Sequence, residues 1–585
     1  MSLHQNENVA WWKDAVIYQI YPRSFYDANG DGVGDLAGIR EKADYLSHLG
    51  VDAIWLSPIY ESPNADWGYD VSDYYAIDPI FGDLEEFDAL LEELHRREIR
   101  LIMDLVVNHT STEHPWFKES LRDPRGPFGD FYVWREGNDA APPNNWHSFF
   151  GGSAWKYREE REQYYLHLFD VGQADLNWEN PDLRREIYRI MDWWFDRGID
   201  GFRMDVINMI SKDRRFPNDD RVLDSIATRG TPYFVNGPKL HDYLRELRSN
   251  ALSRPGVTAI GECPGAGVEE VRELANLDGR ELDMVIQMEL MELDHGSGGK
   301  WDIRSWKPEE LAGTIASWQE RLEGVAWPAN FFSNHDQPRA VSRFGDDTNY
   351  RYESATMLAV LLLSQSGTPF VYYGEEIGMP NADYEEIGHY LDVDSRNFYG
   401  LQTMAGREES EVMEIIRYMS RDNARSPMQW DGGPKAGFTS GTPWIPLGRR
   451  SSHVSVEAEE RAERSVLEQY RRLFRLRKTE PALRRGSFAM ADTGNRDLFA
   501  FRKALGPDEL LVLVNLTGRK ARLTADSTAA GALGPVDTDG DGVGDQQVYP
   551  SPKRVYGNYP EKGSITSLAP YEAAIYRLRG GNGRQ

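Results

Sequence analysis

Residues Gly201–Asn208 read Gly-Phe-Arg-Met-Asp-Val-Ile-Asn, an apolar segment that carries one arginine and one aspartate. Side chains two residues apart on a strand point to the same face, so Arg203 and Asp205 are expected to lie side by side. A charged pair inside a buried strand is costly unless its members are paired or used. Taken alone, the segment predicts either a structural ion pair at the end of a strand or part of a catalytic site.

Three other strand-like segments carry polar side chains at or near their ends. These side chains are Asp104, Glu262 and the pair His335–Asp336. In a (β/α)8 barrel the chemistry collects at the C-terminal ends of the strands, which come from distant parts of the sequence. The four segments together therefore predict a (β/α)8 TIM barrel with its active site at that face.

Two further regions depart from the barrel pattern. Residues 110–177 are rich in Pro, Gly, Asn and Trp and lack a clear period, which favours a subdomain inserted after the third strand. From residue 483 onward, short alternating strands predict a C-terminal antiparallel β-sandwich domain. We therefore expect the barrel to comprise 1–109 and 178–482, the inserted subdomain 110–177, and the C-terminal domain 483–585.

The composition excludes some partners. The 94 acidic residues outnumber the 66 basic ones, of which only 14 are lysines, for a net charge of −28. Such a balance argues against nucleic acid as a partner and suits either a salt-adapted protein or an ordinary acidic enzyme. No apolar run approaches the roughly 20 residues that span a membrane, and residues 1–8 lack an apolar signal core, so we expect a cytoplasmic protein. The single cysteine, Cys263, excludes an internal disulfide.

Two acidic loops have the oxygen spacing of a calcium loop. In the first, residues 27–35, candidate ligands occupy positions 1, 3, 5, 7 and 9, with glycine at position 6, but position 12 is Gly38 in place of glutamate. We expect a structural Ca²⁺, or Mg²⁺, in this loop and no organic cofactor; the alternative is an acidic turn. The candidate ligands are Asp27, Asn29, Asp31, Val33 and Asp35, and a second possible site comprises Asp537, Asp539, Asp541, Val543 and Asp545.

The four strand-end segments resemble the signature regions of the α-amylase superfamily, a group of retaining glycoside hydrolases. Gly201–Asn208, Asn334–Arg339 and Arg421–Asp431 are similar to the oligo-1,6-glucosidase and α-glucosidase branch. The resemblance extends from about residue 10 to the C-terminus. It also places a calcium or magnesium site at residues 27–35.

The resemblance assigns roles to the strand-end carboxylates. It implies that Asp205 is the nucleophile, that Glu262 is the general acid and then the base, and that Asp336 is a third catalytic carboxylate that holds the sugar. Arg203 beside Asp205 is expected to keep that carboxylate ionised, because a nearby cation favours the charged form. Cys263 lies next to Glu262 but has no base partner in the sequence, so we interpret it as a packing residue.

The resemblance also implies a set of sugar-binding residues. Asp66 and Arg425 are expected to meet at the floor of a closed pocket, which predicts exo-action. Trp67 stands where the family usually has asparagine. Val206 follows the nucleophile and goes with α-1,6 preference in the family, although a β-branched residue also suits the barrel core. The full set is Asp66, Tyr69, His109, Phe150, Phe169, Arg203, Val206, His335 and Arg425.

The expected activity is that of a retaining exo-α-glucosidase acting on short oligosaccharides, with a preference for α-1,6 links. The alternatives are an enzyme active on α-1,4 links or sucrose, a transglucosylase, and a sucrose isomerase. Isomerases carry an Arg-Leu-Asp-Arg-Asp loop, whereas residues 292–296 read Glu-Leu-Asp-His-Gly, which resembles the hydrolases. A non-catalytic relative is disfavoured because every expected carboxylate is present. The sequence gives no indication of oligomeric state.

Overall fold

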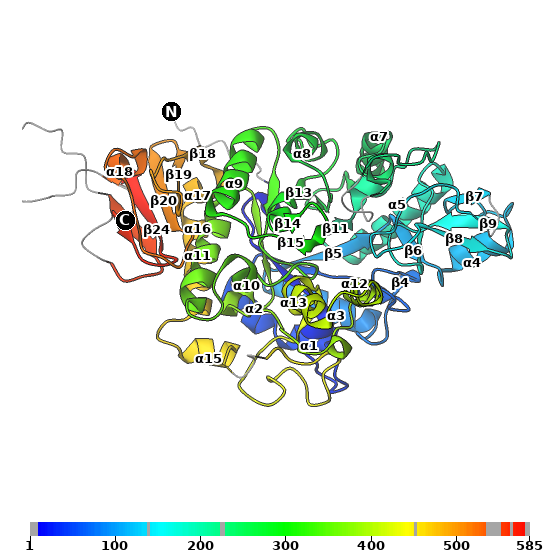
Figure 1. Cartoon of the computed structure of the whole chain (residues 1–585), viewed down its shortest axis with the longest axis horizontal. Helices are drawn as coiled ribbons and strands as arrows, with labels where there is room; N and C mark the ends of the chain where they lie inside the picture. The colour runs from blue at the N-terminus through cyan, green and yellow to red at the C-terminus, as the bar shows by residue number, and fades with distance from the viewer. Residues whose placement is uncertain are drawn as a thin grey trace, which may run out of the picture.

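Eight parallel strands close into a barrel at the centre of the molecule (Figure 1). The structure, a computed structural model, describes residues 10–136, 141–222, 229–449, 453–533, 552–561 and 566–579. The barrel order β1–β17–β16–β13–β12–β11–β5–β2 confirms the predicted fold class. Its strands are β1 (Ile17–Ile20), β2 (Ala53–Leu56), β5 (Arg100–Val106), β11 (Gly201–Asp205), β12 (Thr258–Gly261), β13 (Met284–Ile286), β16 (Pro328–Asn330) and β17 (Thr368–Tyr372).

Helices fill the connections between these strands and cover the outside of the barrel. Their ends follow local sequence signals, as in α5, where the Asn180 side chain caps the first turn and Gly198 ends the helix in a left-handed conformation. The covering helices are α1 (Leu36–Glu41), α2 (Ala43–Leu49), α3 (Leu84–Arg96), α5 (Pro181–Arg197), α7 (Leu240–Leu247), α8 (Val268–Leu274), α9 (Pro308–Leu322), α10 (Ala340–Phe344), α11 (Arg351–Ser364) and α16 (Val466–Thr479).

One strand ends earlier than its sequence predicts. The apolar run before His335 suggested a strand reaching Asp336, but β16 ends at Asn330. The Asn334 side chain accepts a hydrogen bond from the Asp336 backbone N–H at 2.8 Å and closes a local turn in place of strand pairing. His335 and Asp336 therefore lie on the loop that follows β16.

The inserted subdomain forms one end of the molecule, at the right of Figure 1. It begins with β6 (His109–Ser111), which pairs in antiparallel fashion with β10 (Gln173–Asp175). Between them lies a three-stranded sheet in the order β7 (Trp134–Glu136), β9 (Gln163–Leu166), β8 (Trp155–Arg158), with α4 (Pro115–Arg122) beside it. This pairing brings the subdomain back to the end of β5, next to the barrel opening.

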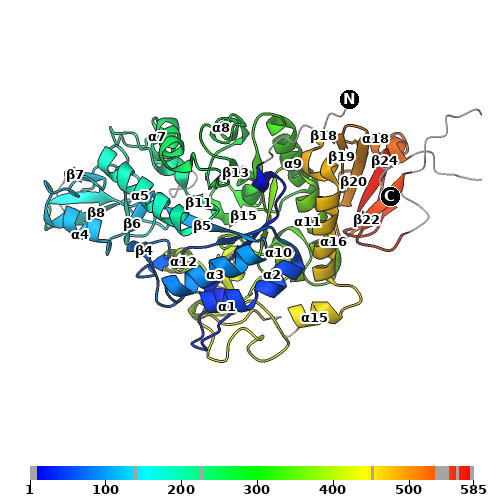
Figure 2. The same cartoon turned by 180° about the vertical axis from the view of Figure 1, so that it is seen from behind.

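A five-stranded antiparallel sheet lies at the opposite end of the molecule, as both views show (Figures 1 and 2). Along β19, Phe499 and Phe501 pack into the main core while Leu498 and Ala500 pack into a second cluster, as the period of a strand requires. That second cluster lies between the sheet and the pair β21 (Ala521–Arg522) and β23 (Ser567–Leu568). The sheet comprises β18 (Ser487–Met490), β19 (Leu498–Leu505), β20 (Asp508–Asn515), β24 (Ala573–Arg579) and β22 (Lys553–Gly557).

A long insertion separates β17 from α16. It contains α12 (Val393–Met404), α13 (Glu409–Met419), α14 (Asp422–Arg425) and α15 (Val456–Arg461). The insertion matters for the site because α12 and α14 reach the barrel opening. Among the residues that the structure describes, no helix has the length and apolarity needed to cross a bilayer.

Candidate active site

Two neighbouring barrel strands bring the expected catalytic pair together. β11 and β12 pair in parallel with Met204 opposite Gly261, so the residues that follow, Asp205 and Glu262, stand at the same level. The Arg203 guanidinium lies between them, with Nη1 2.8 Å from Asp205 Oδ1 and Nη2 2.7 Å from Glu262 Oε2. One buried cation therefore holds both carboxylates side by side.

The same guanidinium also forms an ion pair with a third carboxylate. Arg203 Nη1 lies 2.8 Å from Asp104 Oδ1, and both side chains are fully buried. Burial raises the pKa of Asp205 well above its ordinary value, and Arg203 only partly opposes that rise. One cation thus faces three carboxylates, and the ionised state expected for Asp205 stays a prediction.

Glu262 is held through one of its two oxygens. The Val206 backbone N–H donates to Glu262 Oε2 at 3.2 Å, so this oxygen faces two donors, Arg203 and Val206. When Glu262 is protonated, its proton consequently belongs on Oε1. Val206 reaches this position with φ 37° and ψ 41°, a left-handed conformation that is unusual for a β-branched residue and is typical of strained functional sites.

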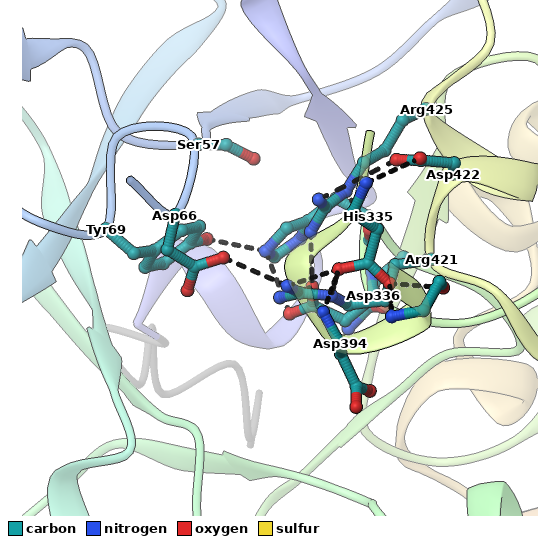
Figure 3. Close-up of polar contacts among 12 residues, drawn as sticks. Ser57, Asp66, Tyr69, His335, Asp336, Asp394, Arg421, Asp422 and Arg425 are labelled. Atoms are coloured by element: carbon teal, nitrogen blue, oxygen red, sulfur yellow. Dashed lines mark hydrogen bonds and ion pairs between the residues drawn. The ribbon is translucent and has the colours of Figure 1, made fainter. Parts of the chain in front are cut away.

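Asp336, on the loop after β16, lines the same cavity as the pair. Figure 3 shows it among His335, Arg421 and Arg425. Its Oδ1 lies 2.9 Å from Arg425 Nη2 and 3.3 Å from Arg421 Nη1, while its Oδ2 lies 3.0 Å from His335 Nε2. Burial raises the pKa of Asp336, but His335, Arg421 and Arg425 together hold it well below its ordinary value. Asp336 therefore stays ionised.

Asp66 closes the ring of charges. Arg421 Nη2 lies 2.9 Å from Asp66 Oδ1, whereas the sequence led us to expect Arg425 at this position. Arg425 instead binds Asp336 and donates from Nε to the His335 carbonyl at 2.9 Å. Burial raises the pKa of Asp66 to about 6, although Arg421 lowers it. We call Asp66, Asp336 and Arg421 the inner end of the site.

Tyr69, His335 and His109 pack around this inner end. The Tyr69 ring stacks on His335 at 5.2 Å between centroids, and its hydroxyl donates to Asp104 Oδ2 at 3.0 Å. His109 Nε2 lies 3.1 Å from the Tyr69 carbonyl, and its ring lies 5.2 Å from Phe169. Burial lowers the pKa of His109 to about 4, so this imidazole is neutral near pH 7.

A cavity of about 380 Å³ joins these groups. Three of the predicted catalytic and sugar-binding residues are buried behind the cavity wall, where they contact groups that line it: Arg203, His335 and Arg425. Nine of the twelve predicted catalytic and sugar-binding residues line it directly: Asp66, Tyr69, His109, Phe150, Phe169, Asp205, Val206, Glu262 and Asp336.

The outer rim of the cavity is built from three separate segments. The hairpin of β14 (His295–Gly296) and β15 (Gly299–Ile303) supplies Lys300, whose Nζ lies 2.9 Å from Asp394 Oδ2 on α12. The Asn397 side chain of α12 donates to the Phe150 carbonyl of the subdomain at 2.9 Å. We call Phe150, Lys300 and Asp394 the mouth of the site.

The chain was compared with known proteins. A family model described as "Alpha amylase, catalytic domain" matches residues 19–486. The chain belongs to the α-amylase family. It is a glycoside hydrolase, as the family and its named relatives indicate.

Three relatives illustrate the range of this family. The oligo-1,6-glucosidase of Parageobacillus thermoglucosidasius is 46% identical over 574 residues, which are 97% of this chain and 99% of the relative. The trehalose-6-phosphate hydrolase of Escherichia coli is 45% identical and covers 87% of this chain and 91% of its own length. The solved isomaltulose synthase of a Klebsiella species superposes with a TM-score of 0.89 at 38% identity, covering 98% of this chain and 100% of the other.

Several functional positions of this α-amylase family member were missed from the sequence. Arg421 lies in the motif Arg421–Asp431, but sequence spacing does not say which of Arg421 and Arg425 reaches Asp66. Gln173 lines the cavity and donates to Asp66 Oδ2 at 3.3 Å. Lys300 and Asp394 meet only in the folded chain, and no local pattern marks them as partners.

The predicted calcium loop is closed by its own hydrogen bonds. Asp27 Oδ1 and Oδ2 accept the backbone N–H groups of Gly30 and Gly32 at 2.6 and 2.7 Å, and Asp35 Oδ1 accepts that of Gly38 at 2.6 Å. Across the described residues, no group of three or more His, Cys, Asp or Glu side chains converges to hold a metal ion. The metal therefore stays a prediction. The second loop, residues 537–545, lies outside the described residues.

A buried lysine joins the subdomain to the barrel. Lys212 Nζ lies 2.7 Å from Asp175 Oδ1 on β10 and 2.8 Å from Asn108 Oδ1 beside the end of β5. Asp175 Oδ2 in turn accepts the Leu168 backbone N–H at 2.8 Å. An internal ammonium group therefore neutralises the oxygens at this junction, behind the wall that carries His109.

Proposed function

We propose that the protein is a retaining, exo-acting α-glucosidase that releases terminal glucose from short neutral oligosaccharides, with α-1,6 links preferred. The observation that carries the proposal is the arrangement of the cavity. Asp205 and Glu262 stand together on Arg203 at one side, and the buried ion pair of Asp66 with Arg421 closes the inner end. A closed inner end favours a terminal sugar over an internal one.

The chemistry follows from two carboxylates with one proton between them. Asp205 attacks the anomeric carbon of the bound glucosyl unit while Glu262 Oε1 gives its proton to the leaving oxygen, which breaks the glycosidic bond. Water then attacks the glucosyl ester, and Glu262 takes back the proton as glucose leaves. Asp336, held ionised by its cations, is placed to bind hydroxyls of the sugar as positive charge develops on the ring.

The charge of the cavity favours a neutral substrate over a phosphorylated one. Each cation that lines it already has a carboxylate partner: Lys300 is paired with Asp394, and Arg421 with Asp66. His295, which also lines the cavity, is neutral near pH 7 because burial lowers its pKa to about 4. A phosphate group would meet five carboxylates and no unpaired cation among these lining residues, so trehalose 6-phosphate is disfavoured.

The loop before the mouth favours hydrolysis over sucrose isomerisation. Asp294 is buried and fixed by Arg343, whose Nε lies 2.8 Å from Asp294 Oδ2, and by the Tyr418 hydroxyl at 2.9 Å. The next residue, His295, lines the cavity where the isomerase motif has arginine. A neutral imidazole stabilises the negative charge on the oxygen of a leaving fructose less than a guanidinium would.

Steady-state kinetics on five sugars test the proposal. Isomaltose should have the highest kcat/KM, maltose and sucrose should be slower, and trehalose 6-phosphate and a reduced, end-blocked dextran should be poor substrates. Proton NMR of the first product should show α-glucose before mutarotation, because two displacements restore the configuration. β-Glucose as the first product, or efficient cleavage of the blocked dextran, would overturn the proposal.

We also propose that residues 27–35 bind a structural Ca²⁺ or Mg²⁺. The support is the run of oxygen-bearing residues at calcium-loop spacing, with Asp27, Asp31 and Asp35 as the charged members. Melting in EDTA should lower Tm, and added Ca²⁺ should restore it, while Asp31→Asn should lose that response. Elemental analysis of the purified protein that finds no bound metal, together with an unchanged Tm in EDTA, would contradict the proposal.

The acidic composition supports a proposal about salt. With a net charge of −28, self-repulsion opposes folding at low ionic strength and is screened over about 8 Å at 0.15 M salt. We infer that Tm rises as KCl increases from low to molar concentration. A midpoint that stays constant or falls would remove the salt-adapted interpretation.

A further inference from the structure

Asp66 and Tyr69 are presented by a tight turn with an unusual residue at its centre. The Tyr69 backbone N–H donates to the Asp66 carbonyl at 3.1 Å, which closes a four-residue turn. Both central residues have positive φ, 50° at Trp67 and 103° at Gly68, as in turns of type I′. Asparagine and glycine suit such positions, whereas a bulky residue there is a conformational outlier.

The Trp67 side chain is held by a cation and a second indole. The Arg23 guanidinium carbon lies 5.0 Å from the centre of the Trp67 ring and 5.4 Å from that of Trp444. The two indoles contact each other, with 5.0 Å between ring centroids. Arg23 is buried, so its attraction to both aromatic faces is little screened by water. We call Arg23, Trp67 and Trp444 the clamp.

The clamp connects the two partners of the inner end. Trp444 Nε1 donates to Ser24 Oγ at 3.0 Å, and Ser24 Oγ donates to the Arg425 carbonyl at 2.6 Å. Arg425 belongs to α14, and Arg421 directly precedes this helix. The segment that carries Asp66 and the segment that carries its partner Arg421 are thus tied to one aromatic cluster. Neither Trp67 nor Trp444 lines the cavity itself.

We propose that Trp67 is a positioning residue, which acts through Asp66 and Tyr69: its indole, held between Arg23 and Trp444, keeps the turn in its left-handed conformation. The inference rests on the proposed glucosidase function, because Asp66 is taken to grip the terminal glucose. Strain at Trp67 is tolerated because the clamp compensates for it, and the same clamp fixes the distance between Asp66 and Arg421.

Three variants of Trp67 separate the ring from the backbone preference. Trp67→Asn suits the left-handed backbone and loses the ring, Trp67→Phe keeps a ring, and Trp67→Ala loses both advantages. We expect kcat/KM for isomaltose to fall about tenfold or more in Trp67→Asn and further in Trp67→Ala, and to stay within about threefold in Trp67→Phe. Equal activity of wild type and Trp67→Asn would overturn the proposal, as would equal losses in the Asn and Phe variants.

A matched control is available on the outside of the barrel. Trp193 on α5 also has a guanidinium, that of Arg197, 5.0 Å from its ring centre and an aromatic partner, Tyr75, at 5.4 Å. Trp193→Ala should lower Tm by an amount comparable to Trp67→Ala while leaving kcat/KM unchanged. A fall in kcat/KM for Trp193→Ala that matches Trp67→Ala would show that loss of stability alone explains the effect and would overturn the positioning role.

A panel of monodeoxy p-nitrophenyl α-glucosides gives a readout that a purely structural role does not move. Asp66→Asn identifies the sugar hydroxyl that Asp66 binds. The fall in kcat/KM caused by this substitution should disappear for the deoxy substrate that lacks that hydroxyl. The fall in kcat/KM caused by Trp67→Asn should be smaller for the same deoxy substrate. An equal fall for every substrate of the panel would count against the positioning role of the clamp. If wild type hydrolyses no α-glucoside, the proposed function fails; if it does and Trp67→Asn matches it, only the present inference fails.

Discussion

The inner end and the mouth of the cavity are built in different ways. At the inner end, Asp66, Asp336 and Arg421 are largely withdrawn from water and joined by ion pairs of 2.9 and 3.3 Å. At the mouth, the Lys300–Asp394 pair and one hydrogen bond from Asn397 hold three segments together, and the Phe150 ring also lies 5.0 Å from the Arg421 guanidinium. Displacing a buried charge from its partner is costly, so the inner end has little freedom, whereas the mouth can vary.

This difference separates two parts of the reaction. In the proposed reaction, the inner end and the carboxylate pair contact the glucosyl unit that every substrate shares, while the mouth contacts the departing group. α-Glucosyl fluoride has the same glucosyl unit and almost no leaving group. Comparing isomaltose with this fluoride therefore separates effects on the chemistry from effects at the mouth, and the five variants that follow use that comparison.

Glu262→Gln should have the largest effect. Removing the proton donor should lower kcat for isomaltose by about 10²–10⁴-fold, because the leaving sugar oxygen needs a proton. Fluoride leaves without one, so formation of the glucosyl enzyme from α-glucosyl fluoride should remain fast. Pre-steady-state kinetics on both substrates measure the contrast. Equal losses on the two would remove Glu262 as the general acid.

Asp66→Asn should have the next largest effect, and it should appear with both substrates. Losing a charged hydrogen-bond partner of the sugar should lower kcat/KM by about 10–150-fold. The pH profile sharpens this prediction. Because burial raises the pKa of Asp66 to about 6, the carboxylate is protonated below that pH and ionised above it. Wild-type kcat/KM should therefore rise as pH increases through about 6.

The same raised pKa has a consequence for stability. A buried carboxyl whose pKa is higher in the folded than in the unfolded chain stabilises the fold at low pH and loses that contribution between about 3.9 and 6 as pH rises. Asp66→Asn should remove this contribution. Thermal melts of the two proteins at pH 4 and pH 7 measure it, and a Tm difference that is independent of pH would contradict the assignment.

Val206 lies between the inner end and the mouth, and Val206→Thr should change which glycosidic linkage is preferred. Val206 lines the cavity directly after the nucleophile, and threonine keeps its shape while adding a hydroxyl. The ratio of kcat/KM for isomaltose over maltose should fall about tenfold, with α-glucosyl fluoride unaffected. An unchanged ratio would place linkage choice elsewhere. A loss on the fluoride would instead indicate that the substitution disturbs the strained backbone that donates to Glu262.

The meeting of the three predicted catalytic carboxylates could be expected from the sequence, whereas the Asp66–Arg421 pair and the Lys300–Asp394 pair could not. Asp205 ends β11, and Glu262 and Asp336 follow β12 and β16, so the barrel topology alone brings them to one face. The partner of Asp66 was assigned wrongly because Arg421 and Arg425 both lie in the same short segment, and only the packing of α14 decides between them. Lys300 lies on a hairpin and Asp394 on a helix, 94 residues apart in the sequence, so no local sequence pattern indicates that they pair.

The structure also adds to the electrostatic expectations. Arg203 is expected to keep Asp205 ionised, and the structure shows that Asp104 and Glu262 share the same guanidinium. The number of carboxylates around one cation cannot be read from the sequence. Likewise the left-handed backbone of Val206 and of Trp67 is imposed by their surroundings, since neither residue favours it.

Lys300→Met should have the smallest effect and gives the sharpest test of the comparison. Lys300 lines the cavity at the mouth, as do its neighbours Gly298 and Gly299. Methionine keeps the length of the side chain and removes one hydrogen-bond donor, so kcat/KM for isomaltose should fall about 2–10-fold, mostly through KM. Asp394→Asn, the matched variant on the other side of the pair, should behave alike. α-Glucosyl fluoride should be hydrolysed at the wild-type rate by both, because no second sugar reaches the mouth. If either variant slows the fluoride as much as isomaltose, the mouth and the inner end are coupled, and the separation between chemistry and leaving-group choice does not hold.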